Sequence, residues 1–172
     1  TRKRTLFPYT TLFRSSTVAG DAALRGRIET LRLEVLRGAV RRGDLREKVA
    51  EMRERMRREL SGAKPGQFDL KQDRGGIADI EFLAQYWALR WADEFPPVVH
   101  FSDTIRQLES VASAALVPQA EVDQLVAAYQ RYRHAAHRLS LEGQPGVVDA
   151  GQFTAEREQV AAIWRATMGE SV

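Results

Sequence analysis

Hydrophobic residues recur along much of the chain at alternating spacings of four and three positions, which is the period of an amphipathic α-helix. The first such segment covers about residues 21–40, and the second covers about residues 44–60. Asp44 and Glu47 have the spacing of a capping box at the start of the second segment. We expect the two helices to pair antiparallel through their apolar stripes. The stripe of the first helix consists of Leu24, Ile28, Leu31 and Val35.

Charged residues fill most of the positions between the apolar residues of the second helix. Acids and bases are mixed there at spacings that allow ion pairs one turn apart. We therefore expect this charged run to form a solvated face of the helix. The run comprises Arg53, Glu54, Arg55, Arg57, Arg58 and Glu59.

Segment 77–92 is apolar nearly all round, unlike the other helical segments. A helix without a polar face is buried, so we expect this one to lie at the centre of the domain. Further helices are expected over about 102–115, over 118–141, and from Thr154 onward. Phe68–Lys71 is the one extended segment, and we expect its partner strand to come from missing upstream residues. The pattern predicts an all-α bundle of about six helices with one short extended segment before a Gly-Gly turn.

Candidate chemistry lies where the extended segment turns into the central helix. Gly75 and Gly76 allow a sharp turn and a close approach of the backbone to a ligand. The helix that follows begins with N–H groups and a positive dipole end, which suit an anion such as a phosphate. Lys71 and Arg74 flank the turn, and Asp79 lies in the first turn of the helix. The alternative is a tight loop with solvated bases and an acid that only stabilises the helix start.

Asp79 and Glu81 are acids on a helix that we expect to be buried, and buried carboxylates need compensating partners. Arg133 and His137 are four positions apart on the longest helix, so they share a face. We expect Glu81 to form a structural pair with Arg133 or His137, while Asp79 stays near the Gly-Gly turn. The two acids point roughly 200° apart around the helix and cannot chelate one ion together. We therefore predict no metal site.

The segment KQDRGGIADIEFLAQYWALRWA resembles the Gly-Gly-Ile-x-Asp-Ile-Glu-Phe signature of the glutamine synthetase adenylyltransferase family. Two later blocks, AYQRYRHAAHRL and FTAEREQV, resemble helices of the same family in matching order and spacing. The likeness covers roughly residues 24–168. It implies a large, cytoplasmic, bifunctional enzyme that uses ATP and Mg²⁺ to adenylylate a tyrosine of glutamine synthetase. Its other half removes the AMP by phosphorolysis, and the PII signal protein is a further implied partner.

The same resemblance places the metal-binding acids of the nucleotidyltransferase core upstream of this region, and no such motif lies between Ser16 and Phe68. We therefore expect residues 16–172 to be a helical domain that follows a missing core. The match near the chain end favours the C-terminal, adenylylating half. Such a fragment would be inactive alone, would bind no cofactor alone, and would supply a wall of the nucleotide pocket. The residues implied for that wall are Lys71, Arg74, Gly75, Gly76 and Asp79.

Residues 5–15, TLFPYTTLFRS, are what a common sequencing adapter encodes, so we interpret residues 1–15 as an artefactual, disordered arm. The net charge of +3 depends on four basic residues in this arm, and without them the chain has a slight acidic excess. The basic pI therefore implies neither a nucleic-acid nor a membrane partner. The absence of cysteine excludes disulfides and thiolate metal sites, and no apolar run reaches membrane-spanning length.

Alternative functions remain open from the sequence alone. A helical bundle of this kind also suits a regulatory or partner-docking domain without catalytic activity, or a purely structural bundle. The related PII uridylyltransferases carry a similar Gly-Gly turn, although the helix after it does not read DIEF. A nucleotidyltransferase motif encoded before Ser16 would favour an enzyme, whereas an open reading frame that starts nearby would favour a docking domain.

Overall fold

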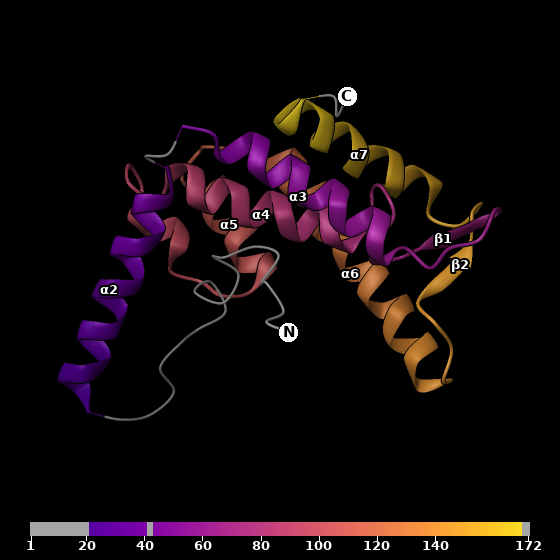
Figure 1. Cartoon of the computed structure of the whole chain (residues 1–172), viewed down its shortest axis with the longest axis horizontal. Coiled ribbons are helices and arrows are strands. Elements are labelled where there is room, and N and C mark those ends of the chain that lie inside the picture. The colour runs from indigo at the N-terminus through magenta and orange to yellow at the C-terminus, as the bar shows by residue number, and fades with distance from the viewer. Residues whose placement is uncertain (1–20, 41–42, 170–172) are drawn as a thin grey trace.

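The computed structural model describes residues 21–40 and 43–169, so the predicted arm at residues 1–15 lies outside the described residues. Within this part there are six α-helices and one small two-stranded sheet, which lies at one edge of the molecule (Figure 1). The prediction of an all-α bundle of about six helices is confirmed. The elements are α2 (Ala22–Val40), α3 (Leu45–Leu60), β1 (Gln67–Asp69), α4 (Ile77–Trp91), the 3-10 helix η1 (Pro96–Val99), α5 (Thr104–Ser113), α6 (Gln119–Leu141), β2 (Val147–Asp149) and α7 (Thr154–Met168).

Helix α4 is the centre of the fold, as its apolar sequence predicts. Nearly all of its residues are buried, from Ile77 to Leu89. It packs against each of the other α-helices described by the structure. Each large apolar side chain that it buries contributes about 1.5–3 kcal/mol relative to exposure. The position of α4 therefore fixes where the turn that precedes it lies in the domain.

The extended segment before the turn finds its partner within the chain. Strand β1 pairs antiparallel with β2, and Phe68 lies opposite Val148 in the register. The expectation of a partner from missing upstream residues was wrong, because the loop after α6 supplies it. Phe68 is fully buried and packs edge-on against Tyr132 of α6, with ring centroids 5.9 Å apart. The strand pair and this aromatic contact anchor the chain just before the Gly-Gly turn.

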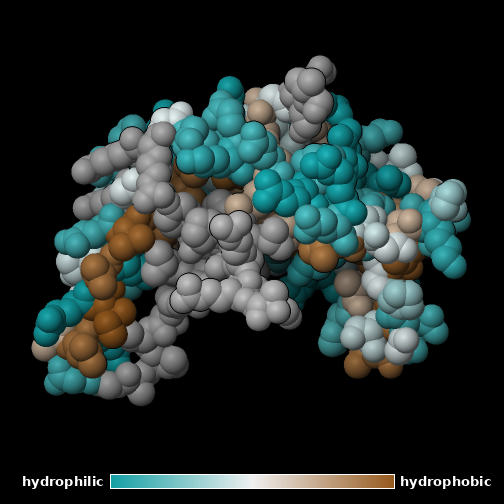
Figure 2. Space-filling view, viewed as in Figure 1, coloured by the Kyte–Doolittle hydropathy of each residue, from teal (hydrophilic) through white to brown (hydrophobic). Residues whose placement is uncertain are grey.

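Helix α2 packs mainly against α4 and η1, so the expected antiparallel pairing of the first two helices was wrong. Its buried face is not the predicted stripe. Leu36 is fully buried there, and Arg32 donates from Nη2 to the carbonyl oxygen of Val99 at 2.8 Å. Figure 2 shows the apolar residues that remain on the outside of α2. They are the predicted stripe residues, with exposed fractions of 54% for Leu24, 45% for Ile28, 61% for Leu31 and 41% for Val35.

The start of α3 also differs from its prediction. Asp44 is the N-cap residue, but its side chain makes no capping hydrogen bond. Its Oδ2 instead contacts Nζ of Lys48 at 2.6 Å, one turn along the helix. The predicted capping box with Glu47 was therefore wrong, since the Asp44 carboxylate pairs with Lys48 and bonds no helix amide.

Substitution of two leucines on α2 tests which face of that helix contributes to stability. Leu36→Ala should lower the free energy of unfolding by about 2–5 kcal/mol, because the side chain is fully buried. Leu31→Ala should change it by less than about 1 kcal/mol, because Leu31 is 61% exposed. Urea denaturation of both variants is the measurement, and equal losses would contradict the observed orientation of α2.

No helix in the described part of the chain combines the length and the apolar character needed to cross a membrane.

Candidate functional site

The Gly-Gly turn is packed against the chain itself. Gly75 has a φ of +77°, and a Cβ added there would lie 2.4 Å from the carbonyl oxygen of Arg157 in α7. A Cβ on Gly76 would lie 2.8 Å from the carbonyl oxygen of Leu70. Both positions require glycine because other backbone segments leave no space for a side chain. The close approach predicted at this turn is real, but its partner is the protein's own backbone.

The N–H groups at the start of α4 all have acceptors within the chain. The expectation of unsatisfied amides at this helix start, available to a phosphate, was therefore wrong. The preceding turn folds its carbonyl oxygens over the helix end and satisfies the groups that usually remain free. The bonds run from Gly76 N to Asp73 O (3.0 Å), Ile77 N to Leu70 O (2.9 Å), Ala78 N to Lys71 O (3.1 Å) and Asp79 N to Gly76 O (3.2 Å).

Asp79 forms the buried ion pair of the site, and its partner is Arg53 of α3. Arg53 Nε donates to Asp79 Oδ1 at 2.7 Å, with exposed fractions of only 2% for Arg53 and 4% for Asp79. The other carboxylate oxygen of Asp79 accepts from the N–H of Gly75 at 2.7 Å. Arg53 also donates from Nη2 to the carbonyl oxygen of Gln72 at 2.8 Å. One arginine thus ties α3 to both sides of the turn.

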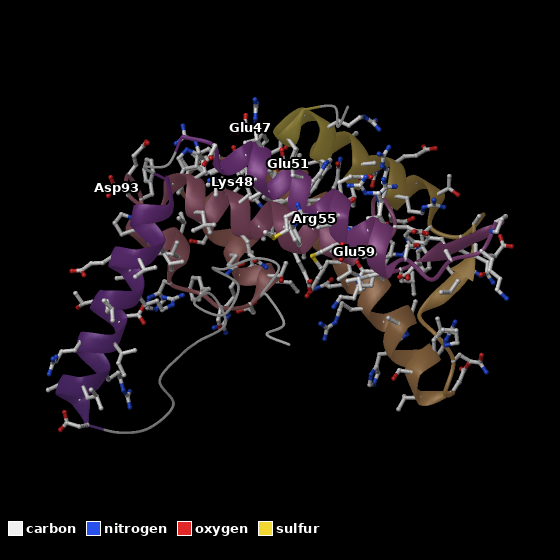
Figure 3. All side chains as sticks on the ribbon, in the orientation of Figure 1. Glu47, Lys48, Glu51, Arg55, Glu59 and Asp93 are labelled. Atoms are coloured by element: carbon white, nitrogen blue, oxygen red, sulfur yellow. The ribbon has the colours of Figure 1, made fainter. Side chains whose placement is uncertain are left out.

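Arg53 was assigned to the solvated face of α3, and this assignment was wrong. Figure 3 shows that face, which includes Glu47, Glu51, Arg55 and Glu59, all exposed. Arg53 instead follows buried Val49 by one helical turn, so it lies on the inner side of α3. This placement could have been predicted from the sequence, since a residue four positions after the apolar Val49 lies on the same face of the helix.

The pKa values of two acids in this region, Asp79 and Glu54, are shifted by their surroundings. Burial raises the pKa of Asp79 above its ordinary value, while the Arg53 charge and the Gly75 amide oppose that increase. The hydrogen bond from Arg57 lowers the pKa of Glu54, which lies nearby on α3. Arg53 and Gly75 thus offset part of the cost of removing the Asp79 carboxylate from water.

Asp79 lies beside the Gly-Gly turn, where it was expected, and it also has a buried arginine partner that was not expected. Glu81 is partly exposed, and its Oε1 lies 3.5 Å from the Tyr129 hydroxyl, which donates to it. Arg133 and His137 are exposed on α6, and they line one open depression together with Glu81 and Lys71. Pairing of Glu81 with either base stays a prediction, but such a pair would be solvated rather than buried.

The remaining candidates border a different hollow, which we call the arginine cavity. It has a volume of about 210 Å³ and lies between α3, the Gly-Gly turn and α7. Arg74 and Asp79 contribute to its lining, whereas Lys71 lies on the open depression. The structure therefore divides the predicted site residues between two surfaces. The charged lining residues of the arginine cavity are Arg53, Glu54, Arg57, Arg74, Asp79 and Arg165.

The Gly-Gly turn and the buried helix after it also lie in the part of the sequence that matches known proteins. The family model described as GlnD PII-uridylyltransferase matches residues 43–145, which include the turn and helices α4 to α6. The chain belongs to this family.

Curated relatives of the chain carry one enzyme name. The chain is 42% identical to a protein of Thioalkalivibrio sulfidiphilus over 92% of its own length, and 43% identical to one of Nitrosococcus oceani over 91%. It is 40% identical to a protein of Pseudomonas aeruginosa over 90%. All three are named bifunctional glutamine synthetase adenylyltransferase/adenylyl-removing enzyme, so the resemblance expected from the DIEF helix is confirmed. The chain spans only 16% to 17% of the length of these relatives.

Proposed function

We propose that the chain is a helical part of an enzyme that transfers AMP from ATP to a tyrosine of glutamine synthetase and removes it by phosphorolysis. The observation that carries this proposal is the shared name of relatives about 40% identical over nine-tenths of the chain. In the proposal, glutamine synthetase is the protein substrate, the PII signal protein is a regulator, and the enzyme acts in the cytoplasm. The chain itself follows the nucleotidyltransferase core in the C-terminal half.

ATP and Mg²⁺ belong, in this proposal, to that core. Asp79 is the carboxylate nearest the turn, but Oδ1 accepts from Arg53 and Oδ2 accepts from Gly75. Both oxygens are thus engaged by the protein itself, and the side chain is only 4% exposed, so we propose no metal ligand at Asp79. Within the described residues, no group of three His, Cys, Asp or Glu side chains is close enough to hold a metal ion. We therefore assign no metal-dependent step to this chain.

The proposed task of the chain is to present a rigid wall to the nucleotide. Gly75, Gly76 and Asp79 hold the shape of the turn through backbone contacts and the buried ion pair. Lys71 and Arg74 flank the turn with exposed side chains, which leaves their charges available to neutralise phosphate oxygens. We propose that these two bases contact the nucleotide and that the other three residues position them.

Labelling of glutamine synthetase tests the proposed activity. With radiolabelled ATP and Mg²⁺, the full-length enzyme that contains this segment should label the synthetase, whereas the isolated chain should not. In the full-length enzyme, replacing both Lys71 and Arg74 by alanine should raise the KM for ATP about tenfold or more, the effect of losing charge-assisted hydrogen bonds. Lys64→Ala, an exposed loop variant, is the control. Labelling by the isolated chain would show that it contains its own catalytic site.

The description of the matching family model favours a second candidate, a uridylyltransferase that acts on PII. The two candidates differ in nucleotide and in protein substrate. The same full-length enzyme should therefore also be incubated with labelled UTP and PII. Transfer of UMP to PII without AMP transfer to glutamine synthetase would replace the first proposal with the second. A full-length protein active in neither assay would instead support a regulatory or docking bundle.

A further inference from the structure

The arginine cavity concentrates positive charge in a small space. Four guanidinium groups and two carboxylates line it among the residues that the structure describes. The two acids contact three of the four arginines. Asp79 is paired with Arg53, and Glu54 contacts both Arg57 and Arg74, the latter at 3.8 Å. The lining thus carries an excess of positive charge that its own acids do not neutralise.

Arg53 provides a second, independent indication of a missing anion. Its side chain lines the cavity and is only 2% exposed, yet its buried Nη1 has no hydrogen-bond acceptor within the described part of the chain. A buried donor without an acceptor is destabilising, and more so when it is charged. Asp79 does not supply this acceptor, since its hydrogen bond with Arg53 is made to Nε and leaves Nη1 unpartnered.

The other walls of the cavity suit a compact ligand. Helix α7 contributes Trp164, Arg165 and Gly169 near its C-terminal end, and Ala50 lies opposite on α3. Of these residues, Ala50 and Trp164 place apolar groups beside the charged ones. Arg74 is 64% exposed at the turn, so the charged lining of the cavity extends to the protein surface.

We propose that the arginine cavity binds a phosphate group, either free phosphate or the terminal phosphate of a small monoester. Guanidinium groups donate pairs of parallel hydrogen bonds that match phosphate oxygens. A phosphate monoester carries a charge of about −1.5 to −2 at pH 7, which matches the excess of two bases in the lining better than one carboxylate does. The ligand would complete the hydrogen bonding of Arg53. The inference does not depend on the proposed enzymatic function, because α3, the turn and α7 supply every group involved.

Titration of the full chain with inorganic phosphate, followed by calorimetry and by the thermal midpoint, tests the proposal. We expect saturable binding and a midpoint that rises with phosphate concentration, since a ligand of the native state stabilises it. Sodium chloride at equal ionic strength should not reproduce the effect, because screening alone fills no site. Arg165→Gln should weaken binding about tenfold or more, the effect of removing one charge-assisted hydrogen bond. Arg55→Gln, on the exposed face of α3, should leave binding unchanged.

Further outcomes of these titrations decide the inference. No saturable binding, or equal weakening by Arg165→Gln and Arg55→Gln, would overturn it. Acetate that binds as tightly as phosphate would overturn the assignment to a phosphate group. Glycerol phosphate distinguishes the sources: tighter binding of the ester assigns the site to a phosphate monoester, and tighter binding of inorganic phosphate assigns it to the free ion.

Discussion

Replacing Arg53 by alanine will lower the free energy of unfolding by about 3–5 kcal/mol, the usual effect of leaving one member of a buried ion pair without its partner. The guanidinium lies 2.7 Å from Asp79, and both side chains are almost fully buried. Without it, the Asp79 carboxylate must either stay ionised in a poorly solvated place or take up a proton. The variant also loses the bond to the carbonyl oxygen of Gln72, which holds the turn against α3.

Urea denaturation of the full chain measures this loss, with Arg55→Ala as the matched control. Arg55 lies on the exposed face of the same helix, so its removal should change stability by no more than about 0.5 kcal/mol. A double variant, Arg53→Met with Asp79→Asn, should lose less than the two single variants together, because the charge left unpaired in each is then absent. Equal effects of Arg53→Ala and Arg55→Ala would show that the ion pair does not brace the turn.

The second large effect is expected at the turn itself. Gly75→Ala should cost about 3 kcal/mol or more, because two penalties combine. The residue has a φ of +77°, which costs an L-amino acid roughly 1–2 kcal/mol. The added Cβ would also lie 2.4 Å from the carbonyl oxygen of Arg157, so α7 or the turn must move.

Gly143→Ala separates these two penalties. Gly143 has a φ of +68°, but a Cβ added there meets nothing within 4 Å. Its substitution should therefore show the backbone penalty alone, about 1–2 kcal/mol. Thermal and urea denaturation of both variants give the comparison. If Gly75→Ala costs no more than Gly143→Ala, the packing of the turn against α7 does not contribute to stability.

The helices were predictable because their signal is local. The period of apolar residues along α4 and α6 is contained in the sequence of each helix, and the apolar density of α4 alone indicates that it is central. The partner of a helix is not a local property. The stripe of α2 predicted a contact with α3, but α2 turns another face to α4 and η1. Strand β2 has only three residues, too few for a recognisable pattern.

The position of the Gly-Gly turn was more predictable than the contacts made there. The Gly-Gly turn and Asp79 were identified from the sequence, because glycine pairs and acids at helix starts are informative residue types. Whether the amides of that helix are free depends on where the carbonyl oxygens of Leu70 and Lys71 fall, and this is set by the turn as a whole. The partnership of Asp79 with Arg53 depends on the packing of α3 against α4, which no local spacing encodes.

The strand pair has a consequence for the order of folding. Gln67 pairs with Asp149, so β1 and β2 join segments between which α4, α5 and α6 are all made. Closing so long a loop has an entropic cost that a pair of three-residue strands cannot offset alone. We therefore expect the strands to pair after those helices have packed. In a chain made from its N-terminus, Phe68 is present before its β2 partner, and the close approach of Gly75 to Arg157 can form only after α7 has been made.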